Sequence, residues 1–195
     1  MIKLPFKILS GIFSIIIIFG GLLYLYFSPE KNQTLTSLQK ENENREAAFV
    51  KRVVDGDTFL LSNGERVRLL GIDTPEKFES KKLDKDAEIS GMDKKIIQKL
   101  GQLASDYVKN FVEGKKVYLE REPNYEDKDK YNRLLRWIYL EDGTFVNGKI
   151  VRDGYAQVYE KFPVSKLEEL RKYQREAREN NRGLWGNVEG LQQFK

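Results

Sequence analysis

The stretch from residue 53 to residue 76 constrains the fold more than any other part of this 195-residue chain. It contains two apolar runs, at residues 59–61 and 67–70, and the pair Asn63-Gly64 lies between them. An Asn-Gly pair between apolar runs is the strongest short signal for a tight β-hairpin. The sequence therefore predicts two antiparallel strands joined by a turn.

Carboxylates lie at both ends of this predicted hairpin. Asp55 and Asp57 precede the first strand, and Asp73 and Glu76 follow the second. The turn brings the two pairs side by side, with Arg68 on the second strand. Like charges a few ångströms apart repel, so such a cluster is costly unless a cation neutralises it. We therefore expect a bound metal ion.

The chain contains no histidine and no cysteine. This removes the commonest general base, thiolate nucleophiles, disulfides and the usual zinc ligands. Acid–base chemistry must then use carboxylates, lysine, tyrosine or water, and an all-oxygen ligand set selects a hard cation, Ca²⁺ or Mg²⁺, rather than zinc. The net charge of +4, from 34 basic and 30 acidic residues, permits polyanion binding without requiring it.

Residues 8–27 form a run of twenty uncharged, mostly apolar residues. As a helix this run spans about 30 Å, the hydrocarbon thickness of a bilayer. A cleaved signal peptide has a shorter apolar core and small residues at the cut, which residues 24–29 do not offer. Lys3 and Lys7 place the N-terminus in the cytoplasm by the positive-inside rule. The run predicts a single-pass anchor in the cell membrane with the remaining chain outside; secretion after cleavage is the alternative.

The predicted organisation has three parts. Residues 1–27 are a cytoplasmic tip and a transmembrane helix, and residues 28–47 are a polar tether with too few apolar positions for a core. Residues 48–195 are long enough for one domain with a core of ordinary size.

The predicted domain combines short strands with amphipathic helices. Residues 77–95 are dense in charge and are expected to form a loop, either mobile and beside the carboxylates or inert and solvated. Ser165 and Glu168 form a capping-box pattern that opens the last helix. The expected strands lie at 49–54, 59–61, 67–70, 115–120 and 134–140, and the earlier helices run from 93 to Gly114 and over 147–153. This order predicts an α+β fold, a five-stranded Greek-key barrel of the oligonucleotide-binding (OB) type with three helices.

Three segments resemble motifs of the staphylococcal nuclease (thermonuclease) family. Residues 55–58 read DGDT and residues 68–76 read RLLGIDTPE, while residues 129–133, DKYNR, resemble the family's Lys-Tyr-Gly-Arg loop. Asn132 takes the place of the glycine, and asparagine tolerates the left-handed conformation better than most residues. The resemblance covers roughly residues 49–185 and implies the same barrel in a membrane-anchored member.

The resemblance also implies roles for individual residues. Arg68 and Arg133 are expected to clamp the phosphate, and Glu76 is assigned as the general base toward a water. The metal site is expected to comprise Asp57 and Asp73 as direct ligands, the backbone carbonyl of Thr74, and Asp55 acting through water, with Ca²⁺ preferred over Mg²⁺.

Three further residues are expected to meet the substrate. Lys130 and Tyr131 are placed to contact a phosphate or nucleotide, and Tyr159 is a candidate for stacking on a base, although an aromatic residue in a barrel is more often part of the core.

The predicted function is that of a Ca²⁺-dependent endo- or exonuclease. It would hydrolyse DNA and RNA with low sequence specificity and a preference for single strands, contact the bilayer through residues 8–27 and need no obligate protein partner. The alternative is a tethered barrel that binds nucleic acid or protein without catalysis.

Overall fold

The computed structural model describes residue 37, residues 40–123 and residues 125–186. The expected transmembrane helix at residues 8–27 lies outside these residues. Within the described ranges, no helix combines the length and the apolar character that crossing a membrane requires. The chain divides into a unit that ends at Asn44 and a compact unit that begins at Arg45. The first strand begins at Glu46, two residues before the domain boundary expected at residue 48.

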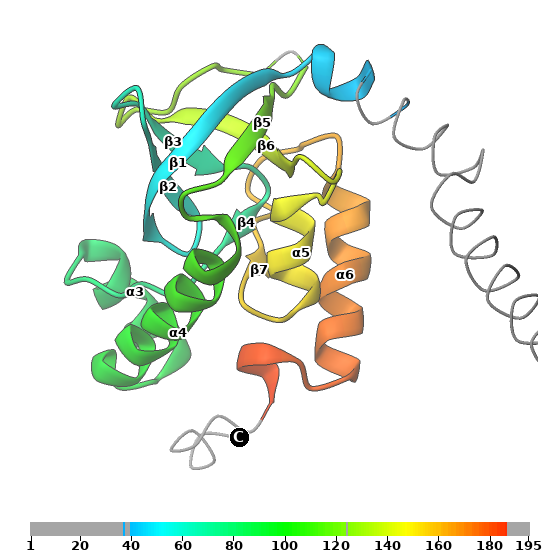
Figure 1. The fold of residues 1–195 in the computed structure, drawn as a ribbon. Coiled ribbons are helices and arrows are strands. Elements are labelled where there is room, and N and C mark those ends of the chain that lie inside the picture. Colours follow the sequence, from blue (N-terminus) through cyan, green and yellow to red (C-terminus); the bar gives the residue numbers. More distant parts are fainter. Residues whose placement is uncertain (1–36, 38–39, 124, 187–195) are drawn as a thin grey trace, which may run out of the picture. The chain divides into compact units, whose positions relative to one another are not determined.

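The second unit contains a closed five-stranded barrel, as predicted (Figure 1). The strands follow one another around the barrel in the order β1-β2-β3-β6-β5, and only the β3–β6 pair is parallel. A separate two-stranded sheet joins β4 to β7. The strands are β1 (Glu46–Asp55), β2 (Thr58–Leu61), β3 (Arg66–Leu69), β4 (Ile72–Asp73), β5 (Lys116–Glu120), β6 (Leu134–Leu140) and β7 (Gln157–Val158).

The predicted hairpin is confirmed as the pair β2–β3. Gly64 turns the chain at a φ of 89°, a left-handed value that glycine adopts without strain. Phe59 pairs with Val67, and both side chains are fully buried. Because side chains alternate along a strand, Arg68 points away from the barrel core that its neighbour Val67 enters.

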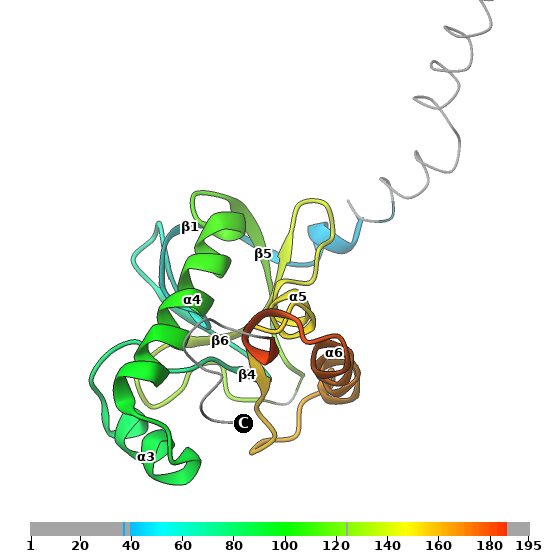
Figure 2. The ribbon, with the colours of Figure 1, turned by 90° about the horizontal axis from the view of Figure 1, so that it is seen from below.

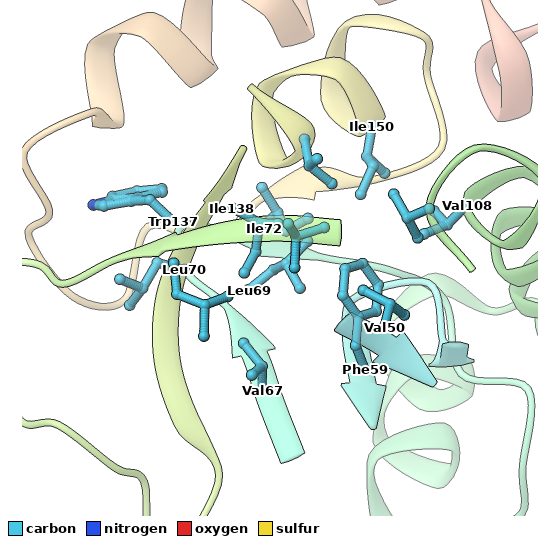
Figure 3. Packing of buried hydrophobic residues seen from close by; sticks show 14 of the residues in the cluster. Val50, Phe59, Val67, Leu69, Leu70, Ile72, Val108, Trp137, Ile138 and Ile150 are labelled. Atoms are coloured by element: carbon cyan, nitrogen blue, oxygen red, sulfur yellow. The ribbon is translucent and has the colours of Figure 1, made fainter. Parts of the chain in front are cut away.

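The barrel interior is filled by aliphatic and aromatic side chains (Figure 3). Phe59, Leu69 and Ile138 gather between the strands, and Val108 of the long helix α4 (Lys94–Val112) closes one side. The buried side-chain amide of Asn147 donates a hydrogen bond to the carbonyl oxygen of Leu70 at 3.0 Å, close to the end of β3. This hydrogen bond and the burial of Leu70 and Ile72 hold the segment that leads to Asp73.

In the unit that begins at Arg45, the described α-helices are four rather than the predicted three. Helices α4 (Lys94–Val112), α5 (Val146–Arg152) and α6 (Leu167–Glu179) match the expected ones, with a 3₁₀ turn at Gly183–Trp185. Helix α3 (Lys81–Ser90) occupies the segment that was predicted to be a loop, so that prediction is wrong. Figures 1 and 2 place α3 beside one end of α4, and α5 beside α6.

The physical reason for α3 lies in its two ends. The Ser80 hydroxyl accepts a hydrogen bond from the Leu83 amide at 3.0 Å and caps the N-terminus. Gly91 ends the helix in the left-handed conformation at a φ of 70°. Leu83 is the residue of α3 that is fully buried, so one anchor and two caps suffice to form a helix in a charged segment.

The expected capping box at Ser165 is wrong as well. Helix α6 begins at Leu167, and its N-cap residue Lys166 makes no side-chain capping bond. The Ser165 hydroxyl donates instead to Glu122 at 2.7 Å, and Glu168 pairs with Arg171. A tertiary contact therefore engages the Ser165 side chain, and an i,i+3 ion pair within α6 engages that of Glu168.

Candidate active site

The two carboxylate motifs come together at one end of the barrel. Asp57 lies in the tight turn between β1 and β2, and Asp73 ends β4. The Thr74 amide donates to Asp57 Oδ2 at 3.0 Å, and the Thr74 hydroxyl donates to the same oxygen at 3.2 Å. Segments seventeen residues apart in sequence are thus joined directly, as the hairpin predicted.

Arg68 lies between the two motifs and binds both. Its Nη2 donates to Asp73 Oδ1 at 2.8 Å, and its Nη1 forms an ion pair with Asp57 Oδ2. Burial alone would raise the pKa of Asp57, but the charge of Arg68 and the hydrogen bonds that Asp57 receives hold this pKa below its usual value. The guanidinium side chain is only 15% exposed, so these contacts act in a poorly solvated setting.

The remaining aspartates are under-neutralised. Burial, followed by the charge of Asp57, raises the pKa of Asp55 to about 7. The same two causes raise the pKa of Asp73, although Arg68 and Lys82 partly offset them. Additional positive charge would therefore be favoured at this end of the barrel.

Glu76 lies close to the first turn of helix α3. Lys82 Nζ contacts Glu76 Oε1 at 3.0 Å, and the Ser80 hydroxyl lies 3.4 Å from Glu76 Oε2. The same ammonium contacts Asp73 Oδ2 at 3.1 Å and donates to the carbonyl oxygen of Thr74 at 3.2 Å. Burial alone would lower the pKa of Lys82, but the charges of Asp73 and Glu76 outweigh this effect and raise the pKa above its usual value. The side chain is therefore protonated at neutral pH.

The oxygen donors of the cluster suit a hard cation. Arg68 and Lys82 together face more carboxylates than they can neutralise. Within the described part of the chain, no three His, Cys, Asp or Glu side chains are grouped closely enough to hold a metal ion among themselves. The predicted metal site needs fewer carboxylates than such a group, because it uses Asp57, Asp73 and the backbone carbonyl of Thr74. Each of these three groups already contacts Arg68 or Lys82. The carboxylates in contact with the two cations are Asp57, Asp73, Glu76 and Asp86.

Arg133 reaches this cluster from the loop between β5 and β6. Its Nη1 donates to Thr58 Oγ1 at 3.3 Å, and the Thr58 hydroxyl donates to Asp57 Oδ1 at 3.1 Å. Asp129 holds the guanidinium, accepting from its Nε and contacting its Nη2, both at 2.7 Å. Asn132 adopts a φ of 61°, the left-handed region that glycine favours, and so the turn is preserved with asparagine.

The expected substrate-contacting residues fall into two groups. Tyr131 is 67% exposed, with Lys130 Nζ 5.0 Å and Arg133 5.4 Å from its ring centroid. Tyr159 belongs to another aromatic group, with its ring centroid 6.1 Å from that of Phe162. The Tyr159 amide donates to the carbonyl of Gly71 at 2.9 Å, which ties it to the chain just before Asp73.

Sequence reasoning missed four residues that position this site: Thr58, Ser80, Lys82 and Asp129. Asp129 and Thr58 lie inside the quoted motifs, and their link to Arg133 is a tertiary contact that no local pattern shows. Ser80 and Lys82 escaped because their segment was interpreted as a loop. The spacing of Ser80 before a Lys82–Asp86 pair at i and i+4 was the available signal.

Comparison with known proteins identifies a family and several relatives. The profile of the family described as staphylococcal nuclease homologue matches residues 66–187. The thermonuclease of Staphylococcus intermedius is 31% identical over 185 residues, which cover 92% of this chain and 98% of that protein. An uncharacterized endonuclease of Escherichia coli O157:H7 is 34% identical over 143 residues, 72% of this chain and 77% of that protein.

A much longer relative also matches. The endonuclease YhcR of Bacillus subtilis is 30% identical over 193 residues, which cover 90% of this chain. The matched region is only 15% of that protein.

Proposed function

The chain belongs to the staphylococcal nuclease family and is a nuclease, and from this premise we propose that it hydrolyses phosphodiester bonds of DNA and RNA with the help of bound Ca²⁺. One observation carries the proposal: Asp57 and Asp73 converge on Arg68, while Glu76 lies beside Asp73 through a shared lysine contact.

Asp57, Asp73 and the carbonyl of Thr74 would hold the cation, with Asp55 acting through water. Hard divalent cations prefer such oxygen donors, and Ca²⁺ accepts irregular ligand sets more readily than Mg²⁺. So few protein ligands imply weak binding, with a dissociation constant of roughly 10⁻⁴–10⁻³ M. Bound Ca²⁺ would neutralise charge on the non-bridging phosphate oxygens.

The two arginines would receive the phosphate. Each guanidinium carries five N–H donors, so Arg68 and Arg133 can keep part of their present contacts while donating to phosphate oxygens. The Asp129 contacts fix the orientation of Arg133 before substrate arrives, and such preorganised donors stabilise a developing charge most effectively.

Glu76 would accept a proton from the attacking water. A water deprotonated by Glu76 attacks phosphorus, the bond to the leaving oxygen breaks, and that oxygen takes up a proton from solvent. Pro75 fixes the backbone direction just before Glu76, and Gly101 leaves room for it, because a Cβ at Gly101 would lie 2.6 Å from the Glu76 backbone.

The chemistry of the surrounding surface supports a low sequence specificity. Tyr131 and Tyr159 offer aromatic faces on which any base can stack, and Lys130 offers a charge to the backbone. Stacking needs unpaired bases, which favours single-stranded substrates.

We also propose that residues 8–27 anchor the enzyme in the cell membrane, with residues 45–186 on the outer side. The support is the apolar run itself and the position of Lys3 and Lys7 before it. Added protease should then reach the domain in intact cells. A shortened chain in the medium would support secretion instead.

Removal of the metal is expected to stop the reaction. The full-length protein in detergent should degrade labelled single-stranded DNA and RNA oligonucleotides at millimolar Ca²⁺, lose this activity with excess EGTA, and regain it when Ca²⁺ is restored. Gel analysis of the products measures turnover, and a filter assay measures binding. Binding without turnover, unaffected by EGTA, would favour the non-catalytic barrel instead.

A further inference from the structure

Lys82 reaches from the first turn of α3 into the proposed metal site. Its Nζ lies 3.1 Å from Asp73 Oδ2 and 3.2 Å from the carbonyl oxygen of Thr74. These are two of the oxygens that the proposed function assigns to Ca²⁺. One ammonium ion therefore already contacts two of the proposed metal ligands.

A calcium ion and this ammonium cannot use the same oxygens together. Ca²⁺ binds oxygen at 2.3–2.6 Å, so an ion touching both Asp73 and Thr74 would fall into the space that Lys82 Nζ occupies. The two positive charges would also repel at very short range in a partly buried setting. Binding of the metal thus requires the ammonium to leave.

The same turn of α3 also engages the proposed general base. Glu76 Oε1 accepts from Lys82, and the Ser80 hydroxyl lies near Oε2. Both carboxylate oxygens therefore have a protein donor from this turn as a neighbour. Departure of Lys82 would free the oxygens of Asp73 and Thr74 for the metal. It would also free Glu76 to accept a proton.

The Lys82 side chain can make this movement while helix α3 stays in place. The neighbouring Leu83 is fully buried and anchors the helix, whereas the Lys82 side chain is 35% exposed. Lys82 has an alternative partner on its own helix, since Asp86 Oδ2 lies 3.3 Å from its Nζ. The lysine can therefore withdraw from the site and keep a carboxylate partner.

We propose that Lys82 is a built-in competitor for the metal: its ammonium contacts the oxygens of Asp73 and Thr74 that the metal would use, and its displacement by a divalent cation frees Glu76 and removes the contacts that tie the first turn of α3 to the site. The inference rests on the proposed metal-binding role of Asp73 and Thr74.

Calcium binding measured by isothermal titration calorimetry tests this without relying on activity. Lys82→Met is expected to bind Ca²⁺ about tenfold more tightly than the wild-type full-length chain, because the apparent affinity is lowered by the fraction of molecules in which the site is blocked. Lys82→Arg should bind as weakly as the wild type. Lys81→Met and Lys85→Met, which remove the same charge from exposed positions of the same helix, should stay within about twofold of it.

Hydrogen exchange provides the second measurement. Peptides from the first turn of α3 should exchange faster in wild-type protein when Ca²⁺ is added, whereas Lys82→Met should show little change because it already lacks the lysine contacts with Asp73, Thr74 and Glu76. Circular dichroism shows whether each variant is folded before it is titrated.

Each result bears on one of the two claims. Equal affinity in Lys82→Met and Lys81→Met, or weaker binding by Lys82→Met, would overturn the competition while leaving the metal role standing. Measurable Ca²⁺ binding by Lys82→Met but not by the wild type would support the competition. Failure of both the wild type and Lys82→Met to bind Ca²⁺ would overturn the metal role and the competition together.

Discussion

Replacement of Glu76 by glutamine is expected to lower kcat for hydrolysis of single-stranded DNA by about 10²–10⁴-fold, the usual contribution of a positioned general base. Glutamine keeps the shape of the side chain: its carbonyl oxygen can accept from Lys82, and its amide nitrogen can donate to the Ser80 hydroxyl oxygen, so thermal unfolding should change little. Initial rates at saturating Ca²⁺ and substrate, compared with melting curves, separate the two effects.

Glu79→Gln is the matched control for this variant. Glu79 is exposed, lies three residues further along the chain, and accepts from Gln98 at 3.1 Å rather than facing the aspartates. Its variant should keep the wild-type rate. A rate for Glu76→Gln within twofold of the wild type would remove Glu76 from the mechanism.

Replacement of Arg68 by methionine is expected to damage both activity and stability. Loss of one preorganised donor to the phosphate should reduce kcat by about 10²–10³-fold. Loss of a buried ion-pair partner leaves Asp57 and Asp73 without their shared cation and should cost about 3–5 kcal/mol in the free energy of unfolding at pH 7. Urea unfolding measures the second effect.

The pH dependence of this stability loss provides a second check. In the wild type the pKa of Asp57 is lowered, so its charge stabilises the fold above the unfolded-chain pKa of about 4, and this is lost as the pH falls through the folded value. Without Arg68 the pKa values of Asp57 and Asp73 should rise. These two carboxyl groups then stabilise the fold as the pH falls, the opposite of the contribution of Asp57 in the wild type. The deficit of Arg68→Met should therefore be largest near pH 7 and shrink toward pH 4.5.

Arg66→Met controls for the loss of a positive charge from β3. Arg66 is exposed two residues before Arg68 on the same strand, and its removal should change the free energy of unfolding by less than about 1 kcal/mol. An equal effect of the two variants, or a deficit in Arg68→Met that does not depend on pH, would contradict the ion-pair description.

The hairpin and the carboxylate cluster could be predicted from sequence because local signals determine them. Asn63-Gly64 sets the register of β2 against β3, and the hairpin brings the segment of Asp57 to that of Asp73, where the Thr74 amide binds Asp57. Arg133 could be assigned only through resemblance to a family motif, because its contact with Thr58 joins residues 75 positions apart.

Helix α3 could not be predicted from apolar periodicity because Leu83 alone is buried along it. Its caps at Ser80 and Gly91 determine it, and the consequence is large, since the position of Lys82 depends on the helix. At Ser165 the local signal for a cap was strong, but the prediction was wrong. The Ser165 side chain binds Glu122 and the Glu168 side chain binds Arg171, so neither caps the helix.

The central claim is that Asp57 and Asp73 hold the cation that drives hydrolysis. The most direct measurement is the initial rate of single-stranded DNA hydrolysis as a function of free Ca²⁺, for the wild-type full-length chain and for Asp73→Asn. We predict half-maximal activity for the wild type at roughly 10⁻⁴–10⁻³ M Ca²⁺ and a requirement at least about tenfold higher for Asp73→Asn. Superimposable curves for the two proteins, or a wild-type rate that does not depend on Ca²⁺, would contradict the claim.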